Sequence, residues 1–153
     1  MLRRNTEREC GMVGVVVETE GEFKGWKRFD TFDSFDALIG PFYFRQEADG
    51  TTRGAFRAEQ KHMNMGGRMH GGCLMTFADI ALFQIAYQEM EGRKGVTLQL
   101  DSTFVDAGRV GDLIEATGEI VRAGGSLVFV RGQITTEGRT LLTFSGIIKK
   151  MRD

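Results

Sequence analysis

One acid stands alone in an otherwise apolar segment. Residues 73–87 read Cys-Leu-Met-Thr-Phe-Ala-Asp-Ile-Ala-Leu-Phe-Gln-Ile-Ala-Tyr, and Asp79 is their single charged residue. Apolar residues fall on every side of a helix with this sequence, which is typical of a buried helix. A buried carboxylate is costly and is enriched at functional sites, so Asp79 is a candidate functional acid. The alternative is a structural acid that pairs with an arginine or accepts backbone hydrogen bonds.

The loop before this helix is the second candidate feature. His70-Gly71-Gly72 stands at the helix start and is preceded by Gly66 and Gly67. Free N–H groups at a helix N-terminus favour negative charge, and glycine lets a ligand approach the backbone closely. The loop therefore predicts an oxyanion site that could stabilise a transition state. Glycines that only form a tight turn, and a His70 that is only a hydrogen-bonded structural residue, are the alternatives.

Other catalytic chemistries have little support. The chain has two histidines and lacks a nearby cluster of Cys or carboxylate ligands, so we expect no metal site. His62 is expected to be a strand residue without a role. Ser102, Ser126 and Ser145 lack a G-x-S-x-G elbow, so a serine triad is not expected.

The helix to about Met90, ended by Gly92, is flanked by segments typical of strands. The expected strands are 42–46, 53–59, 96–105, 113–122, 127–135 and 139–149. Asp49-Gly50, Gly124-Gly125 and Glu137-Gly138 are expected turns between them. One apolar helix with hairpin-linked strands predicts an α+β fold, in which a curled antiparallel sheet wraps the helix.

The N-terminal part of the chain is less regular. Residues 1–10 are polar and are expected to be frayed. The run 13–17 is β-branched and could form an added strand or part of an N-terminal arm. A short helix is expected over 34–39, with Asp33 or Ser34 as its cap and Gly40-Pro41 as its stop. We expect one domain over residues 1–153, with 1–33 as an N-terminal extension.

Composition indicates an ordinary globular protein. The chain has 153 residues, 41 % hydrophobic residues and a net charge of −1, which argues against a dedicated nucleic-acid binder. Cys10 and Cys73 form no disulfide framework, and Cys73 is expected in the core. The longest apolar stretch is too short for a membrane span, and the charged N-terminus does not resemble a signal peptide. We therefore expect a cytoplasmic protein that binds no membrane.

The spacing of these residues resembles the hotdog-fold acyl-CoA thioesterases, specifically their PaaI-like branch from phenylacetate metabolism. The resemblance covers about residues 35–150. It is carried by Asn64, Gly67, His70-Gly71-Gly72 and Asp79, then by 96–104, Gly111-Asp112, Gly118 and the 122–130 hairpin. It implies hydrolysis of an acyl-CoA, with coenzyme A as part of the substrate and no separate cofactor. It also implies a homodimer, or a dimer of dimers, with active sites at the subunit interface.

The resemblance also implies roles for individual residues. Asp79 matches the general base or nucleophile, Gly71 the backbone donor to the thioester oxygen, and His70 and Asn64 the residues that orient the loop or the water. Thr97 matches a position where some members use a hydroxyl to help the water. Strict alternation places the Thr97 side chain on the other face of its strand from Val96, Leu98 and Leu100. The sequence does not decide which of the two faces is directed toward the substrate.

Coenzyme A carries phosphates, which need cations. Similar proteins often have several basic residues in the hairpin after Arg122, whereas this chain has Ala123-Gly124-Gly125-Ser126. The candidate phosphate ligands are Arg93, Lys94, Arg109, Arg122 and Arg139, each of which could equally be a solvated surface charge. The alternative functions are a non-catalytic acyl-CoA-binding protein and an acyl-thioester hydratase or dehydratase. The last pairs a catalytic His with an acid further along the helix, where this chain has Gln84.

Overall fold

The computed structural model describes residues 14–32 and 34–152. Within them, the strands are β1 (Val15–Val17), β2 (Lys27–Phe29), β3 (Tyr43–Gln46), β4 (Thr52–Arg57), β5 (Gly95–Phe104), β6 (Leu113–Ala123), β7 (Leu127–Thr136) and β8 (Arg139–Lys150). The helices are α1 (Phe35–Ile39), the 3₁₀ turn η1 (Gln60–His62) and α2 (Gly71–Ile85). No helix of these residues has the length and hydropathy needed to cross a membrane.

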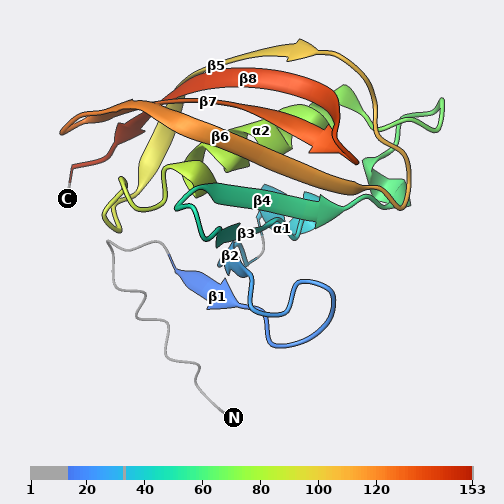
Figure 1. Ribbon diagram of the computed structural model, residues 1–153, viewed down its shortest axis with the longest axis horizontal. Coiled ribbons are helices and arrows are strands. Elements are labelled where there is room, and N and C mark those ends of the chain that lie inside the picture. Colours follow the sequence, from blue (N-terminus) through green and yellow to red (C-terminus); the bar gives the residue numbers. More distant parts are fainter. Residues whose placement is uncertain (1–13, 33, 153) are drawn as a thin grey trace.

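All eight described strands form one antiparallel sheet that curls around α2 (Figure 1). The strand order is β1-β2-β3-β4-β6-β7-β8-β5, so the strand that follows α2 in the chain lies at the far edge of the sheet. The core is formed by α2 and the inner face of the sheet, and it includes Phe56, Phe77, Leu82, Ile114 and Ile148. The α+β class and the curled sheet around one helix are therefore confirmed.

The helix can lie close to the sheet because glycines replace side chains beneath it. A Cβ atom at Gly146 on β8 would lie 2.5 Å from Cδ1 of Leu82 and 2.8 Å from the Gln99 carbonyl oxygen. Cys73 packs in this core, as expected, and burial raises the pKa of its thiol to about 11.

The expected helix end at Met90 is wrong, since α2 ends at Ile85. The backbone N–H of Tyr87 bonds to Gln84 three residues back rather than four, and a series of turns follows. The ring of Tyr87 packs against Phe44, and Met90 is buried, so these tertiary contacts turn the chain before the apolar pattern runs out.

Residues 14–32 and 34–39, here called the N-terminal arm, extend the sheet. β1 pairs with β2, and β2 joins β3 through Lys27 opposite Phe44. The run 13–17 thus forms a strand from Val15, whereas β2 was not expected. Ser34 caps α1 by accepting a 3.3 Å hydrogen bond from the Ala37 N–H, and Gly40 follows the helix. Residues 1–13, including Cys10, and Asp33 lie outside the described residues.

Candidate active site

His70 organises the start of α2. Its Nδ1 accepts a 2.8 Å hydrogen bond from the Gly72 N–H, which makes it the N-cap, and its carbonyl accepts from the Cys73 N–H at 2.9 Å. The Gly71 N–H has no acceptor among the described residues. It is therefore available to a ligand, at the end of the helix where the dipole favours negative charge.

Asn64 shapes the loop that leads to this helix. Its Oδ1 accepts hydrogen bonds from the Gly66 N–H at 2.9 Å and the Arg68 N–H at 3.2 Å. Gly67 takes a positive φ of 72°, and Met63 pairs with Met69 across the loop. The Asn64 side-chain oxygen is thus used in the loop, and its amide nitrogen has no acceptor within the described part of the chain.

His62 is not a strand residue, contrary to expectation, because it ends η1. The residue is 2 % exposed, and its ring Nδ1 accepts from the Glu59 N–H at 2.9 Å while Nε2 lies 2.7 Å from the Ile39 carbonyl. Its own carbonyl accepts from the His70 N–H at 2.8 Å. His62 therefore connects the N-terminal arm to the His70 loop, a role that spacing along the chain could not reveal.

Asp79 lies two turns further along α2 and is half-buried. Its Oδ1 accepts a 2.5 Å hydrogen bond from the Thr97 hydroxyl on β5. No Lys or Arg of the described residues lies within ion-pair distance of it, so the expected alternative of an arginine partner finds no support there. The acid therefore keeps a free oxygen beside an open cavity.

That cavity has a volume of about 360 Å³ and mainly apolar walls. Ile80, Phe83, Tyr87 and Met90 form one side of it, and residues of the N-terminal arm, including Phe29, form the other. An apolar cavity beside a single acid can hold an acyl group with its carbonyl near the carboxylate.

A β-bulge decides the direction of Thr97. On β8, Ile148 faces Thr97 and Ile147 faces Gln99, so Leu98 is the extra residue. The bulge reverses the alternation, and Thr97 shares the inner face with Ser102, whose hydroxyl contacts the Met75 sulfur at 2.7 Å. The sequence did not decide which face of the sheet the Thr97 side chain takes, and the structure places it on the face toward α2.

Gly71 and Asp79 lie at opposite ends of the contact between α2 and β5. Gly71 lies beside Phe104 at the end of β5, since a Cβ atom there would be 3.2 Å from Cε1 of that ring. Asp79 is bonded to Thr97 near the start of β5. Eight residues of helix separate Gly71 from Asp79 by about 12 Å. One chain therefore does not bring the amide and the acid to the same carbonyl group.

The five basic candidates divide into two groups. Arg93 and Lys94 line the cavity of Asp79, and Arg122 lies in the neighbouring hairpin groove. Arg109 and Arg139 lie beyond the other end of β5, where Arg139 forms a 2.5 Å ion pair with Asp106.

Further cations join the first group. A second cavity of about 750 Å³ is lined by Arg93, Lys149, Lys150, Arg152 and the Gly125-Ser126 turn. Neither lysine was among the predicted phosphate ligands, although the expected hairpin of strands 127–135 and 139–149 places Lys149 beside that turn.

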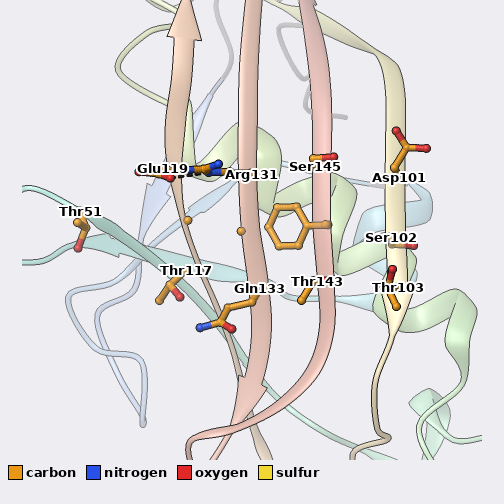
Figure 2. Close-up of a pocket in the computed structure, with 13 residues that line it drawn as sticks. Thr51, Asp101, Ser102, Thr103, Thr117, Glu119, Arg131, Gln133, Thr143 and Ser145 are labelled. Carbon is orange, nitrogen blue, oxygen red and sulfur yellow. Dashed lines mark hydrogen bonds and ion pairs between the residues drawn. The ribbon is translucent and has the colours of Figure 1, made fainter.

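A broader hollow of about 840 Å³ lies over β5–β8 and is not this site. Figure 2 shows its polar lining, including Asp101, Gln133, Thr143 and Ser145, and Arg131 beside Glu119. None of the predicted site residues lines it.

Comparison with known proteins decides the family. Residues 66–143, about half of the chain, match the family model described as "Thioesterase superfamily". The chain belongs to the thioesterase superfamily. The match begins just before the His70 loop and includes Asp79 and Thr97, which are therefore part of this thioesterase domain.

Curated relatives of this thioesterase agree. It is 33 % identical over 111 residues to the Pseudomonas aeruginosa protein named "Putative esterase PA0474", covering 72 % of this chain and 83 % of that protein. It is 23 % identical over 113 residues to human acyl-coenzyme A thioesterase 13, covering 74 % and 81 %.

Solved structures confirm the hotdog fold. The Escherichia coli PaaI protein of the phenylacetic acid degradation operon superposes with a TM-score of 0.68 at 20 % identity, covering 79 % of this chain and 86 % of that one. A Streptococcus pneumoniae thioesterase protein with coenzyme A superposes with a TM-score of 0.65 at 22 % identity, covering 75 % and 93 %. At these identities the likeness concerns the fold alone.

Proposed function

We propose that the protein hydrolyses an acyl-CoA to a free acid and coenzyme A at a site shared by two subunits. Asp79 takes a proton from a water that attacks the thioester carbonyl carbon, or attacks that carbon itself. The Gly71 N–H of the partner subunit holds the carbonyl oxygen as it gains negative charge. In the first route the C–S bond then breaks, and the thiolate of coenzyme A takes the proton from Asp79. In the second route the C–S bond breaks to leave a mixed anhydride on Asp79, and a water hydrolyses this anhydride to the free acid and supplies the proton that the thiolate takes.

The free edge of β5 is the basis of the shared site. β5 has ten residues, pairs only with β8 among the described strands, and carries exposed Val96, Leu98 and Phe104. A long apolar edge strand is a template for pairing with another strand. A second copy of β5, related by a twofold axis, satisfies this edge with an antiparallel ladder.

The observation that carries the proposal is that the acid and the free amide lie at opposite ends of β5, because an antiparallel pair of β5 strands would bring such ends together. With Leu98 as the extra residue of the bulge, a twofold axis through Asp101 places Thr97 opposite Phe104 of the partner subunit, at a strand spacing of about 4.8 Å. Thr97 holds Asp79, and Phe104 lies beside Gly71. The acid of one subunit thus approaches the free amide of the other, which a single chain does not achieve.

Other residues position the substrate in this arrangement. His70 holds the loop so that the Gly71 N–H stays free, and the Asn64 amide nitrogen is available to the water or the thioester. Arg93, Lys94 and Arg122, with Lys149 and Lys150, form the cationic region for the phosphates of coenzyme A. The twofold axis also brings Arg109 and Arg139 of the partner subunit to this end.

A colorimetric assay of thiol release tests the proposal. The protein should release coenzyme A from some members of a panel of aryl- and alkyl-CoA thioesters. Asp79→Asn should lose most of kcat while its circular dichroism and elution volume stay unchanged. Near-wild-type turnover by the folded variant would contradict the role of Asp79, and loss of folding would assign Asp79 a structural role.

A further inference from the structure

One wall of the Asp79 cavity comes from outside the matched family region. Phe29 on β2 lines this cavity of about 360 Å³ from the N-terminal arm, whereas the family match covers residues 66–143. Phe83 and Tyr87 line the cavity from α2 and from the turn that follows it. The mechanism above assigns no role to Phe29.

Phe29 and Tyr87 contact each other, so the two walls of the cavity meet at this pair. Their ring centroids are 6.2 Å apart, which is within the range of interacting aromatic pairs. The ring of Phe44 lies behind both, at 5.1 Å from the Phe29 ring and 5.3 Å from the Tyr87 ring. Phe44 is buried and is not among the residues that line the cavity. The Phe29–Tyr87 pair therefore separates the cavity from the buried ring of Phe44.

The position of Phe29 is fixed by both neighbours of β2. Phe29 lies opposite Val15 on β1, and Lys27 lies opposite Phe44 on β3. Lys27 and Phe29 are two residues apart and share one face of the strand, and the Lys27 ammonium lies over the Tyr87 ring at 5.5 Å. Two side chains of β2 thus pack on the same ring, which sets how far Phe29 reaches into the cavity.

A row of cavity residues leads from the acid toward this pair. Phe83 follows Asp79 by four residues, and Tyr87 follows four residues later, just beyond the end of α2. Residues four apart lie above one another on a helix, so Phe83 is about 6 Å from Asp79 along the axis. An acyl group whose carbonyl lies at Asp79 therefore extends past Phe83 and ends at Phe29 and Tyr87.

We propose that Phe29 is a specificity-determining residue that limits the length of the acyl group. This inference rests on the proposed hydrolysis of an acyl-CoA and names the acyl groups that are accepted. A cavity of about 360 Å³ is near the lower end of the range for ligand pockets, about 300–1,000 Å³. The enzyme takes compact apolar acyl groups and rejects chains that collide with the Phe29 ring.

The test is the dependence of kcat/KM on acyl length, measured with a series of straight-chain acyl-CoA thioesters. The wild type should show a longest accepted chain, beyond which kcat/KM falls. Phe29→Ala removes the ring and should move this limit to longer chains, with a gain of about tenfold or more for the first chain that the wild type rejects. Phe29→Trp enlarges the wall and should move the limit to shorter chains. A residue that only stabilises the arm would not give opposite shifts.

Phe35→Ala is the matched control, because Phe35 is an exposed aromatic residue of the same arm and does not line the cavity. Its limit should stay at the wild-type chain length. An unchanged limit in folded Phe29→Ala, or an equal shift in Phe35→Ala, would overturn the proposal.

Inhibition by free coenzyme A tests the other occupant of the cavity, the pantetheine chain, since Arg93 and Lys94 also line it. Free coenzyme A should inhibit Phe29→Ala as strongly as it inhibits the wild type. Weaker inhibition, together with the same loss of kcat/KM for every acyl length, would overturn the proposal and assign the cavity to pantetheine.

Binding of S-alkyl-coenzyme A thioethers, which lack the thioester carbonyl, separates this proposal from the proposed function. Their affinity, measured by calorimetry, should rise with alkyl length up to a limit, and Phe29→Ala should move that limit whether or not any thioester is hydrolysed. A protein that hydrolyses no acyl-CoA but shows this shift would contradict only the proposed function. An active enzyme with an unmoved limit would overturn the role of Phe29. Phe29→Leu, which keeps an apolar side chain, decides the matter if Phe29→Ala does not fold.

Discussion

The hydroxyl of Thr97 donates a 2.5 Å hydrogen bond to the carboxylate of Asp79 and joins β5 to the middle of α2. The bond exists because the bulge at Leu98 turns Thr97 toward the helix. It fixes one carboxylate oxygen and leaves the other facing the cavity. The candidate catalytic acid is thus held by the strand that we propose as the dimer contact.

Removal of this bond should slow the reaction more than it weakens binding. Thr97→Val is nearly isosteric and removes the donor, so kcat should fall by about 10-fold to 100-fold, since a hydrogen bond to a charged group contributes about 1.5–3 kcal/mol. KM should change little. Steady-state kinetics provide the measurement, and Thr97→Ser, which keeps the hydroxyl, should stay within about threefold of the wild type. Wild-type kcat in Thr97→Val would show that the bond does not orient the acid.

Mixed dimers should recover activity that neither parent has. Gly71→Pro removes the amide donor at the first helical position, where proline is favoured and where the extended ψ of His70 is compatible with it. After dissociation and reassociation with Asp79→Asn, random pairing gives one intact site in each mixed dimer. The mixture should therefore show about one quarter of wild-type activity.

The matched control for that experiment is Gly71→Ala. It keeps the N–H and presents the same Cβ atom to the Phe104 ring, so it should retain far more activity than Gly71→Pro. Mass spectrometry can verify that mixed dimers have formed. If verified mixed dimers of folded parents recover no activity, the acid must act with a donor of its own chain.

A charge on the β5 edge should weaken the dimer. Leu98 is 55 % exposed at the bulge, and Leu98→Asp should raise the dimer dissociation constant by about tenfold or more, as expected for a contact that contributes over 1 kcal/mol. Sedimentation velocity over a range of concentrations measures this. Val121→Asp is the control, because Val121 is 59 % exposed at a bulge in β6, away from the edge. Equal weakening by both variants would argue against the β5 contact.

The buried thiol should react slowly in the folded protein. Because burial raises the pKa of Cys73 to about 11, its thiolate is scarce at pH 8. In a Cys10→Ser background, modification at pH 8 should be at least about 100-fold slower in buffer than in urea, and it should accelerate with rising pH.

The same pKa shift gives the direction of a stability effect. The unfolded chain loses the thiol proton above about pH 8.5 while the folded chain keeps it, so the free energy of unfolding should fall as pH rises from there toward 11. This component of the fall should be absent in Cys73→Ala. Rapid modification in buffer, or the same alkaline fall in the variant, would contradict the buried thiol.

Local patterns were sufficient for most of the fold. Alternating apolar residues predicted six strands to within about two residues, and Glu137-Gly138 forms the expected turn, with positive φ at both positions. The apolar helix begins at its expected glycine, Gly71. These features depend on neighbours in the chain, which a single sequence displays.

Features that depend on distant neighbours could not be read from the sequence. The direction of Thr97 follows from a bulge against β8, and Phe29 reaches the cavity through the pairing of β2 with β1 and β3. The cationic region joins Arg93 to the end of β8 through strand register. Residue types revealed Asp79 and the His70 loop, whereas only the three-dimensional arrangement shows their separation along one helix.

The two edge strands of the sheet differ in length, and this difference limits how many chains could join through strand pairing. β5 presents ten residues, whereas the opposite edge, β1, presents three. Antiparallel pairing of two β5 strands about a twofold axis would use both long edges at once. Among the described strands this would leave the short β1 at each outer end, and a short strand is a poor template for further pairing. The proposed β5 dimer would therefore be self-terminating, so an exposed edge strand in the single chain would lead to a dimer and not to fibres.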